Sequence, residues 1–103
     1  MAAVGFRFES GVAFLRLESA VTGNALDHAL LADLGAAWSR AEGDPECRVV
    51  VLEAEGAGFS RGMDLAAAFG EDGRVARPEA FELYIDLLAG FCRSPRPVVA
   101  RVE

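Results

Sequence analysis

The first part of the chain alternates apolar and polar residues in two short runs, residues 6–9 and 12–18. Alternation with a period of two places alternate side chains on opposite faces of a strand. Ser10 and Gly11 separate the runs, and a two-residue connection of this kind is typical of a tight turn between antiparallel strands. The pattern therefore predicts a β-hairpin at the start of the chain.

Residues 27–42 change to the period of a helix. Asp27 precedes the periodic stretch, and its carboxylate can accept the free N–H groups of a first helical turn. Residues 43–45, Gly-Asp-Pro, follow the stretch and would end a helix. The spacing predicts an amphipathic helix to about Glu42, with an apolar face formed by Leu30, Leu31, Leu34, Trp38 and Ala41.

The remaining apolar segments predict two strands and a second helix. Residues 48–52 form a β-branched run without alternation, which is typical of a parallel strand covered by helices on both faces. Pro78 suits the first turn of a helix that stops at residues 94–95, Ser-Pro, and residues 97–102 begin another strand. The apolar face of this helix is expected to contain Phe81, Tyr84, Leu87, Leu88 and Phe91.

The element order β-β-α-β-α-β predicts an α/β fold, in which an opening hairpin is followed by parallel strands with covering helices. The chain has 103 residues, which is enough for one small domain spanning residues 1–103. Hydrophobic residues make up 52% of the chain, and this content excludes a disordered protein.

The charge of the chain limits its partners. All ten basic residues are Arg and the net charge is −6, so the protein repels phosphate backbones and no nucleic-acid partner is expected. The apolar runs are too short to cross a bilayer, and the N-terminus lacks the features of a signal peptide. We expect a soluble acidic protein of the cytoplasm, without membrane contact.

Residues that commonly bind metals are few and scattered. Cys47 and Cys92 lack metal-ligand spacing, and His28 is the single histidine, so we expect no metal site. A bound cofactor is not expected either. Both cysteines adjoin apolar stretches, which is typical of buried free thiols. His28 falls in the first turn of the predicted helix, where a solvated side chain is expected.

A glycine-punctuated loop at residues 55–65 completes a set of five features with a specific order. Together these features resemble the N-terminal half of the crotonase superfamily, the enoyl-CoA hydratase/isomerase family with its ββα spiral. The resemblance spans nearly the whole chain. The features are the opening hairpin, Asn24-Ala25-Leu26, the strand Val49-Val50-Val51-Leu52, the loop segment Phe59-Ser60-Arg61-Gly62-Met63-Asp64-Leu65, and Arg96-Pro97-Val98-Val99-Ala100.

The resemblance implies that a thioester oxygen accepts two backbone N–H bonds, the first from Met63. Preorganised amides of this kind stabilise the enolate that forms at the thioester. Gly62 would let the backbone approach the ligand, and Asp64 would cap the following turn rather than act catalytically. The residues implied in binding the acyl thioester are Ala25, Leu26, Phe59, Arg61, Gly62 and Asp64, with Ala25 and Arg61 contributing carbonyl groups to an adenine pocket.

For the whole protein, the resemblance implies a lyase or isomerase that hydrates, dehydrates or isomerises an acyl thioester. The second amide donor, the acid/base carboxylates and the oligomer-forming helices of the family would follow Glu103. The chain alone is therefore expected to be inactive, and a homo-oligomer or completion by another chain segment is expected.

At two places the sequence departs from the usual pattern of this family in a way that concerns the substrate. Family members often carry Lys or Arg for the CoA phosphates where Val21 and Thr22 stand here, and Arg61 is the nearest replacement. The Gly-Met-Asp triplet at residues 62–64 also resembles enzymes of polyketide β-branching and other secondary metabolism, whose acyl groups are held by an acyl carrier protein. An acyl carrier protein is therefore a further expected partner.

Alternative interpretations stay open at this point. A non-catalytic crotonase-like module that binds a ligand or another subunit would share the same residues, and Met63 would then fill a gap beneath the loop. Residues 70–77 are either a lid over the acyl site or a surface loop. Arg93 and Arg96 either meet an anionic partner or interact with the dipole of the second helix.

Overall fold

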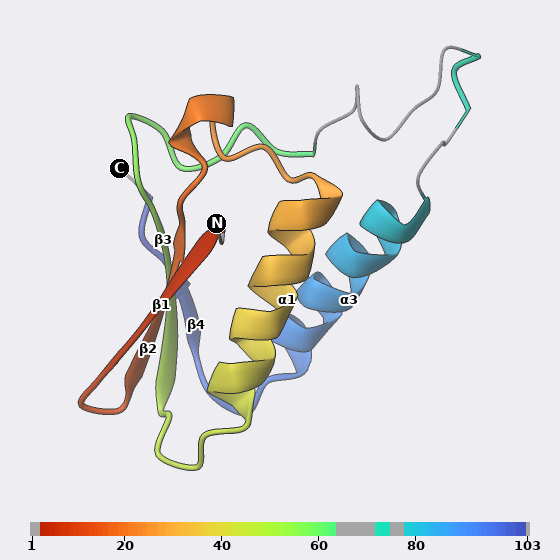
Figure 1. Cartoon of the computed structure of the whole chain (residues 1–103). Helices are drawn as coiled ribbons and strands as arrows, with labels where there is room; N and C mark the ends of the chain where they lie inside the picture. The colour runs from red at the N-terminus through yellow and green to blue at the C-terminus, as the bar shows by residue number, and fades with distance from the viewer. Residues whose placement is uncertain (1–2, 64–71, 75–77, 103) are drawn as a thin grey trace.

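A four-stranded sheet forms one layer of the molecule, and the two long helices of the described part of the chain form the other (Figure 1). The computed structural model describes residues 3–63, 72–74 and 78–102. β1 and β2 are antiparallel, whereas β3 is parallel to β2 and β4 is parallel to β3. This arrangement confirms the predicted α/β class, with its opening hairpin and later parallel strands. The strands lie across the sheet in chain order: β1 (Val4–Glu9), β2 (Val12–Leu17), β3 (Val49–Ala54) and β4 (Val98–Ala100).

The hairpin turn has the geometry that its sequence predicts. Ser10 and Gly11 both have positive φ, at 50° and 83°. Two-residue turns of this kind match the twist of the strands that they join. Glu9 lies opposite Val12, so the register is fixed from the turn onward. In this register the alternate apolar residues of both strands share one face of the sheet.

The first helix, α1 (His28–Glu42), begins and ends where the sequence predicts. The Asp27 carboxylate caps it by accepting a hydrogen bond from the Leu30 N–H at 2.8 Å. Its predicted apolar face is confirmed, and it packs against the apolar residues of β1 and β2. The buried residues of α1 are Leu30, Leu31, Leu34, Ala37, Trp38 and Ala41.

Within the described residues, the helices cover only one face of the sheet. On that face Ala13, Leu15 and Val50 are buried. On the other face Val51 lies in register between Phe14 of β2 and Val99 of β4. The predicted helical cover on both faces is therefore wrong for these residues, because the apolar neighbours of β3 on its second face come from the flanking strands.

The second helix, α3 (Pro78–Arg93), also has the predicted bounds. It packs on α1, where the Trp38 and Phe91 rings meet edge to face with their centroids 4.8 Å apart. A Cβ at Gly90 would lie 2.9 Å from the Trp38 indole nitrogen, so the close approach of the two helices requires glycine there. Leu87 is buried as expected, but Leu88 remains 44% exposed because only one side of α3 faces α1.

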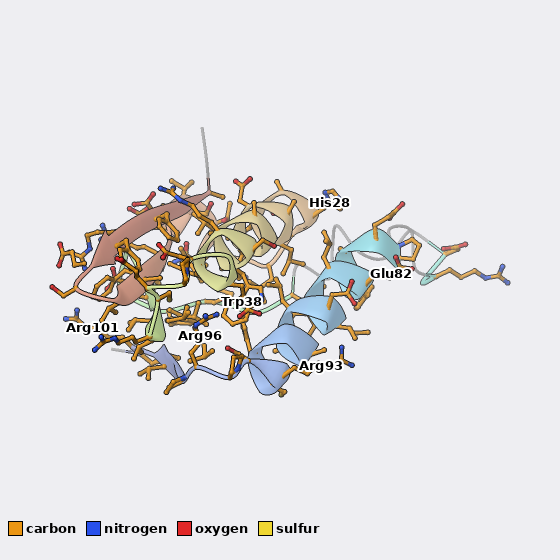
Figure 2. The ribbon with its side chains drawn as sticks, turned by 90° about the horizontal axis from the view of Figure 1, so that it is seen from below. His28, Trp38, Glu82, Arg93, Arg96 and Arg101 are labelled. Carbon is orange, nitrogen blue, oxygen red and sulfur yellow. The ribbon has the colours of Figure 1, made fainter. Side chains whose placement is uncertain are left out.

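The environments of the cysteines and of His28 test three further expectations. Cys47 is a buried free thiol, as predicted. Cys92 is a free thiol but exposed, so the predicted burial is wrong there. It follows Phe91 directly, and one step along a helix turns a side chain about 100° away from the packed side. His28 is exposed at the first turn of α1, as expected (Figure 2).

Arg96 connects the helical layer to the sheet. Its Nη1 atom lies 2.7 Å from a Glu42 carboxylate oxygen, and its Nε–H donates to the Cys47 carbonyl oxygen at 2.9 Å. Figure 2 shows Arg96 near the end of α1, whereas Arg93 lies on the outer side of α3. Arg96 therefore binds the C-terminus of α1, rather than the end of the helix that precedes it in sequence.

Replacing Arg96 by Ala should lower the free energy of unfolding by about 1–2 kcal/mol, because Glu42 and the Cys47 carbonyl lose a charged partner in a partly buried site. Urea unfolding followed by circular dichroism measures this change. Arg93→Ala is the matched control, and its free energy of unfolding should stay within about 0.5 kcal/mol of the original. Equal losses in the two variants would contradict a special role for Arg96.

Candidate functional site

Two loops meet at the carboxyl ends of the parallel strands β2 and β3 (Figure 1). The first loop, residues 18–27, includes a single 3-10 turn, η1 (Ala20–Thr22), and leads into α1. The second loop, residues 55–63, follows β3 directly. Ligands of parallel α/β sheets commonly bind outside the carboxyl ends of the strands. The junction of these loops is therefore the candidate site.

Asn24 joins the two loops through its side chain. It is 1% exposed and has a φ of +53°, a conformation that Asn adopts more readily than most residues. Its amide NH2 donates to the carbonyl oxygens of Glu55 and Phe59, both at 3.0 Å. Its side-chain oxygen accepts from the Ser19 N–H at 2.7 Å. One buried amide thus binds backbone groups on both sides of the junction.

Backbone hydrogen bonds continue the junction beyond Asn24. The Arg61 N–H donates to the Gly23 carbonyl oxygen at 2.9 Å, and the Leu26 N–H donates to the Gly62 carbonyl oxygen at 2.8 Å. Leu26 and Met63 accordingly form a short parallel bridge. The two loops thus run side by side at this point, outside the four-stranded sheet.

This bridge determines the direction of the Met63 amide. The Gly62 carbonyl points toward Leu26, and in a planar trans peptide the following N–H points the opposite way. The Met63 N–H is therefore directed away from the first loop, and it makes no hydrogen bond to another described residue. Gly62 has a φ of +89°, which only glycine adopts easily.

An apolar cavity of about 170 Å³ lies beside this junction, between the sheet, α1 and α3. Leu26 and Phe59, which were predicted to pack beside the ligand or beneath the loop, both contribute to its wall. The cavity is lined by Leu17, Leu26, Leu31, Leu34, Leu52, Phe59, Ser60, Tyr84, Leu87, Leu88 and Phe91. It can hold an apolar group, because nearly all of its lining is hydrocarbon.

Arg61 is exposed and lies against the first loop. A Cβ at Gly23 would overlap the aliphatic part of the Arg61 side chain, so the two are in close contact. Val21 is fully exposed on the same loop. Among the described residues Arg61 forms no ion pair. Its positive charge is thus available near positions 21 and 22, where the sequence lacks one.

The structure brings most of the predicted site residues together. Leu26, Phe59, Arg61, Gly62 and Met63 all lie at the junction. Asp64, the short helical turn predicted to follow it and most of the predicted lid lie outside the described residues.

Two other groups at the junction already accept hydrogen bonds, one from its own loop and one from the opposite loop. The Ala25 carbonyl oxygen already accepts the Asp27 N–H at 3.0 Å, which leaves one lone pair for a ligand. Glu55 accepts the Ala20 N–H at 3.4 Å through its carboxylate.

No group of three or more potential metal ligands occurs in the described part of the chain. No helix there is long and apolar enough to cross a membrane.

Sequence reasoning did not assign roles to two residues of the site, Asn24 and Ser60. Both bind backbone groups across the junction, and the Ser60 hydroxyl donates to the Asn24 carbonyl oxygen at 2.7 Å. The signal for Asn24 was its place beside Gly23 in a loop, where Asn tolerates positive φ. For Ser60 the sequence alone offered no such signal.

Known proteins resemble this chain in sequence and in fold. The family model for enoyl-CoA hydratase/isomerase matches residues 7–103. The chain is 39% identical over 66 residues to the probable enoyl-CoA hydratase EchA14 of Mycobacterium tuberculosis, a stretch that is 64% of this chain and 26% of that protein. An enoyl-CoA hydratase structure from Mycobacterium smegmatis superposes with a TM-score of 0.85 at 37% identity, over 97% of this chain and 39% of its own.

A second solved structure, PA4980 of Pseudomonas aeruginosa, superposes with a TM-score of 0.80 at 33% identity. The match covers 99% of this chain and 44% of that one. The chain thus spans well under half the length of these relatives.

Asn24→Ala should lower the free energy of unfolding by about 3 kcal/mol, because it leaves buried partners unsatisfied and strains a residue at positive φ. Asn24→Gly keeps the backbone conformation, so its loss should be smaller by about 1 kcal/mol. Thr22→Ala is the control, since its hydroxyl makes one exposed bond to the Ser19 carbonyl. Urea titration measures all three, and an Asn24→Ala protein as stable as Thr22→Ala would refute the structural role.

Proposed function

Because the chain belongs to the enoyl-CoA hydratase/isomerase family, we propose that it is the acyl-thioester-binding part of an enzyme that hydrates, dehydrates or isomerises its acyl group. The thioester oxygen would accept a hydrogen bond from the Met63 N–H. The direction of this N–H, away from the first loop and with no acceptor among the described residues, is the observation that carries the proposal.

The chemistry follows from where charge develops in the reaction. Removing or adding a proton next to a thioester carbonyl places negative charge on its oxygen, and a fixed N–H aimed at that atom stabilises the charge. Met63 belongs to a backbone held by the parallel bridge to Leu26, so little reorganisation is needed when the charge forms. The second donor and the proton-transfer groups would come from polypeptide outside these 103 residues.

The acyl group would occupy the apolar cavity beside the junction. Its volume of about 170 Å³ would hold a short hydrocarbon segment of the acyl chain. Burial of hydrocarbon there contributes about 0.8 kcal/mol for each CH2 group. Leu26 belongs to both the cavity wall and the bridge, so the acyl chain and the thioester oxygen would bind at adjoining positions.

The carrier of the acyl group would be recognised by Arg61 and nearby carbonyl groups. Arg61 stands beside Gly23 and adds a positive charge where Val21 and Thr22 have none. A guanidinium at that point suits the phosphates of CoA. If an acyl carrier protein delivers the substrate instead, the phosphopantetheine arm would enter without this contact.

A second candidate function is subunit interaction, favoured by the large hydrophobic residues on the surface. Ile85 and Leu88 of α3 are 62% and 44% exposed, and Val99 and Val102 near the C-terminus are 49% and 66% exposed. Burying these side chains against more polypeptide would be favourable. Sedimentation over a range of concentrations distinguishes this role, since it predicts association without any thioester.

The role of Met63 predicts a change in its amide resonance. Addition of butyryl-CoA should move the Met63 amide proton downfield in a 1H–15N spectrum, because a hydrogen bond to the thioester oxygen deshields it. The thioether S-butyl-CoA is the matched control ligand, since it lacks the carbonyl and should leave this resonance nearly unmoved. Identical responses to the two ligands would remove the basis for the proposal.

Replacing Arg61 by Gln should weaken binding of butyryl-CoA about fivefold, which corresponds to about 1 kcal/mol for one exposed contact between charges. Binding of butyryl-pantetheine, which lacks the nucleotide phosphates, should not change. Isothermal titration at low and high salt measures both affinities. Arg74→Gln is the charge-matched control, and an equal effect of the two substitutions would argue against a specific phosphate contact.

A further inference from the structure

The Ser60 hydroxyl lies between the two loops and uses its donor and an acceptor at once. It donates to the Asn24 carbonyl oxygen at 2.7 Å and accepts the Gly62 N–H at 3.0 Å. With a partner on each side, the hydroxyl cannot rotate without breaking one of these bonds. The residue is half-buried and also contributes to the wall of the apolar cavity.

The backbone on either side of Gly62 needs such a constraint. A Cβ built on Gly62 would meet nothing within 4 Å, so its positive φ of 89° is not enforced by packing around it. Glycine is the residue that changes its backbone angles most freely. Two hydrogen bonds hold it instead: the Leu26 N–H binds its carbonyl oxygen, and the Ser60 hydroxyl binds its N–H.

These two bonds together set the direction of the next amide. The carbonyl oxygen of Gly62 and the N–H of Met63 belong to one planar peptide, so the bond from Leu26 sets the direction of the Met63 N–H. The bond from Ser60 holds the preceding peptide, so that together the two bonds restrict the φ and ψ of Gly62. The bond from Leu26 has a main-chain donor, so no substitution removes the donor, but this single bond leaves both backbone angles of Gly62 adjustable and can be lost as they change. The bond from Ser60 is the one that a side chain contributes.

We propose that Ser60 is a positioning residue, which acts through Gly62 to aim the Met63 N–H at the thioester oxygen. This inference rests on the function proposed above for Met63. A hydroxyl at position 60 stabilises the productive direction of the amide, and its loss allows the peptide between residues 62 and 63 to rotate while the loops stay joined by Asn24. The acyl cavity keeps its hydrocarbon lining when the Ser60 hydroxyl is lost. The loss should therefore reduce the affinity for the acyl thioester less than it reduces the polarisation of the thioester carbonyl.

The first test uses cinnamoyl-CoA, whose absorption moves to longer wavelength when its thioester oxygen accepts hydrogen bonds. At saturation, Ser60→Ala should lose about half or more of the red shift seen with the original chain, because a misdirected dipole stabilises charge poorly. Ser60→Thr keeps the hydroxyl and should restore the shift. Thr22→Ala removes a hydroxyl from the neighbouring loop without touching Gly62, and it should leave the shift unchanged.

The second test measures the direction of the Met63 N–H without any ligand, from its residual dipolar coupling in the full chain. Ser60→Ala should change this coupling, whereas Ser60→Thr and Thr22→Ala should preserve it. Ser60→Cys has nearly the same size and only weak hydrogen bonding, so it serves if Ser60→Ala does not fold, and the same change is expected. An unchanged Met63 coupling in both Ser60→Ala and Ser60→Cys would overturn the inference.

The two tests separate this inference from the proposed function. If the original chain binds cinnamoyl-CoA with no red shift, or does not bind it, the role of Met63 fails and the dipolar couplings alone decide whether Ser60 aims its amide. If the red shift appears and survives in Ser60→Ala with unaltered coupling, Met63 keeps its role and the positioning role of Ser60 is refuted.

Discussion

The buried side chain of Asn24 is the interaction on which the geometry of the site depends. It binds backbone groups that are 31 and 35 residues away in sequence, and so joins loops that the parallel strands bring only to the same edge of the sheet. The second loop is rich in glycine and has few side chains with which to pack. A buried amide with every partner satisfied resists rearrangement, because any alternative leaves a polar group unpaired in the interior. The positions of Gly62 and Met63 follow from this junction.

The proposed site, in which a main-chain N–H would meet the ligand, places unusual demands on sequence. The atom offered to a ligand at position 63 is an N–H that almost any residue possesses, so the identity of that residue matters mainly for the shape of the pocket. The residues around position 63 are the ones whose identity matters. Gly62 permits the positive φ, Ser60 binds the Gly62 N–H, and Asn24 joins the two loops. In the proposed site, the direction of the Met63 N–H is thus specified by these neighbours rather than by the side chain of Met63.

The helical layer supports the same site from the other side. α3 is fastened to α1 by the contact between Trp38 and Phe91 at one end, and Arg96 holds the chain just after α3 to the end of α1. These contacts leave an apolar cavity between the helices and the loop junction, at the edge of the core. In a closely packed domain such a space is unusual. Its position beside the Leu26–Met63 bridge relates the fold of the helices to the proposed acyl site.

The sequence by itself determined the local elements, because their signals are local. Periodicity and caps located α1 and α3, the Ser10-Gly11 turn set the hairpin, and five ordered motifs indicated the family. The tertiary structure decided what depends on distant partners: the exposure of Cys92, the one face of the sheet that the described helices cover, and the pairing of Arg96 with Glu42 rather than with its own preceding helix. It also revealed Asn24 and Ser60 as the residues that hold the junction, because a hydrogen bond between segments more than 30 residues apart leaves no periodic trace in the sequence.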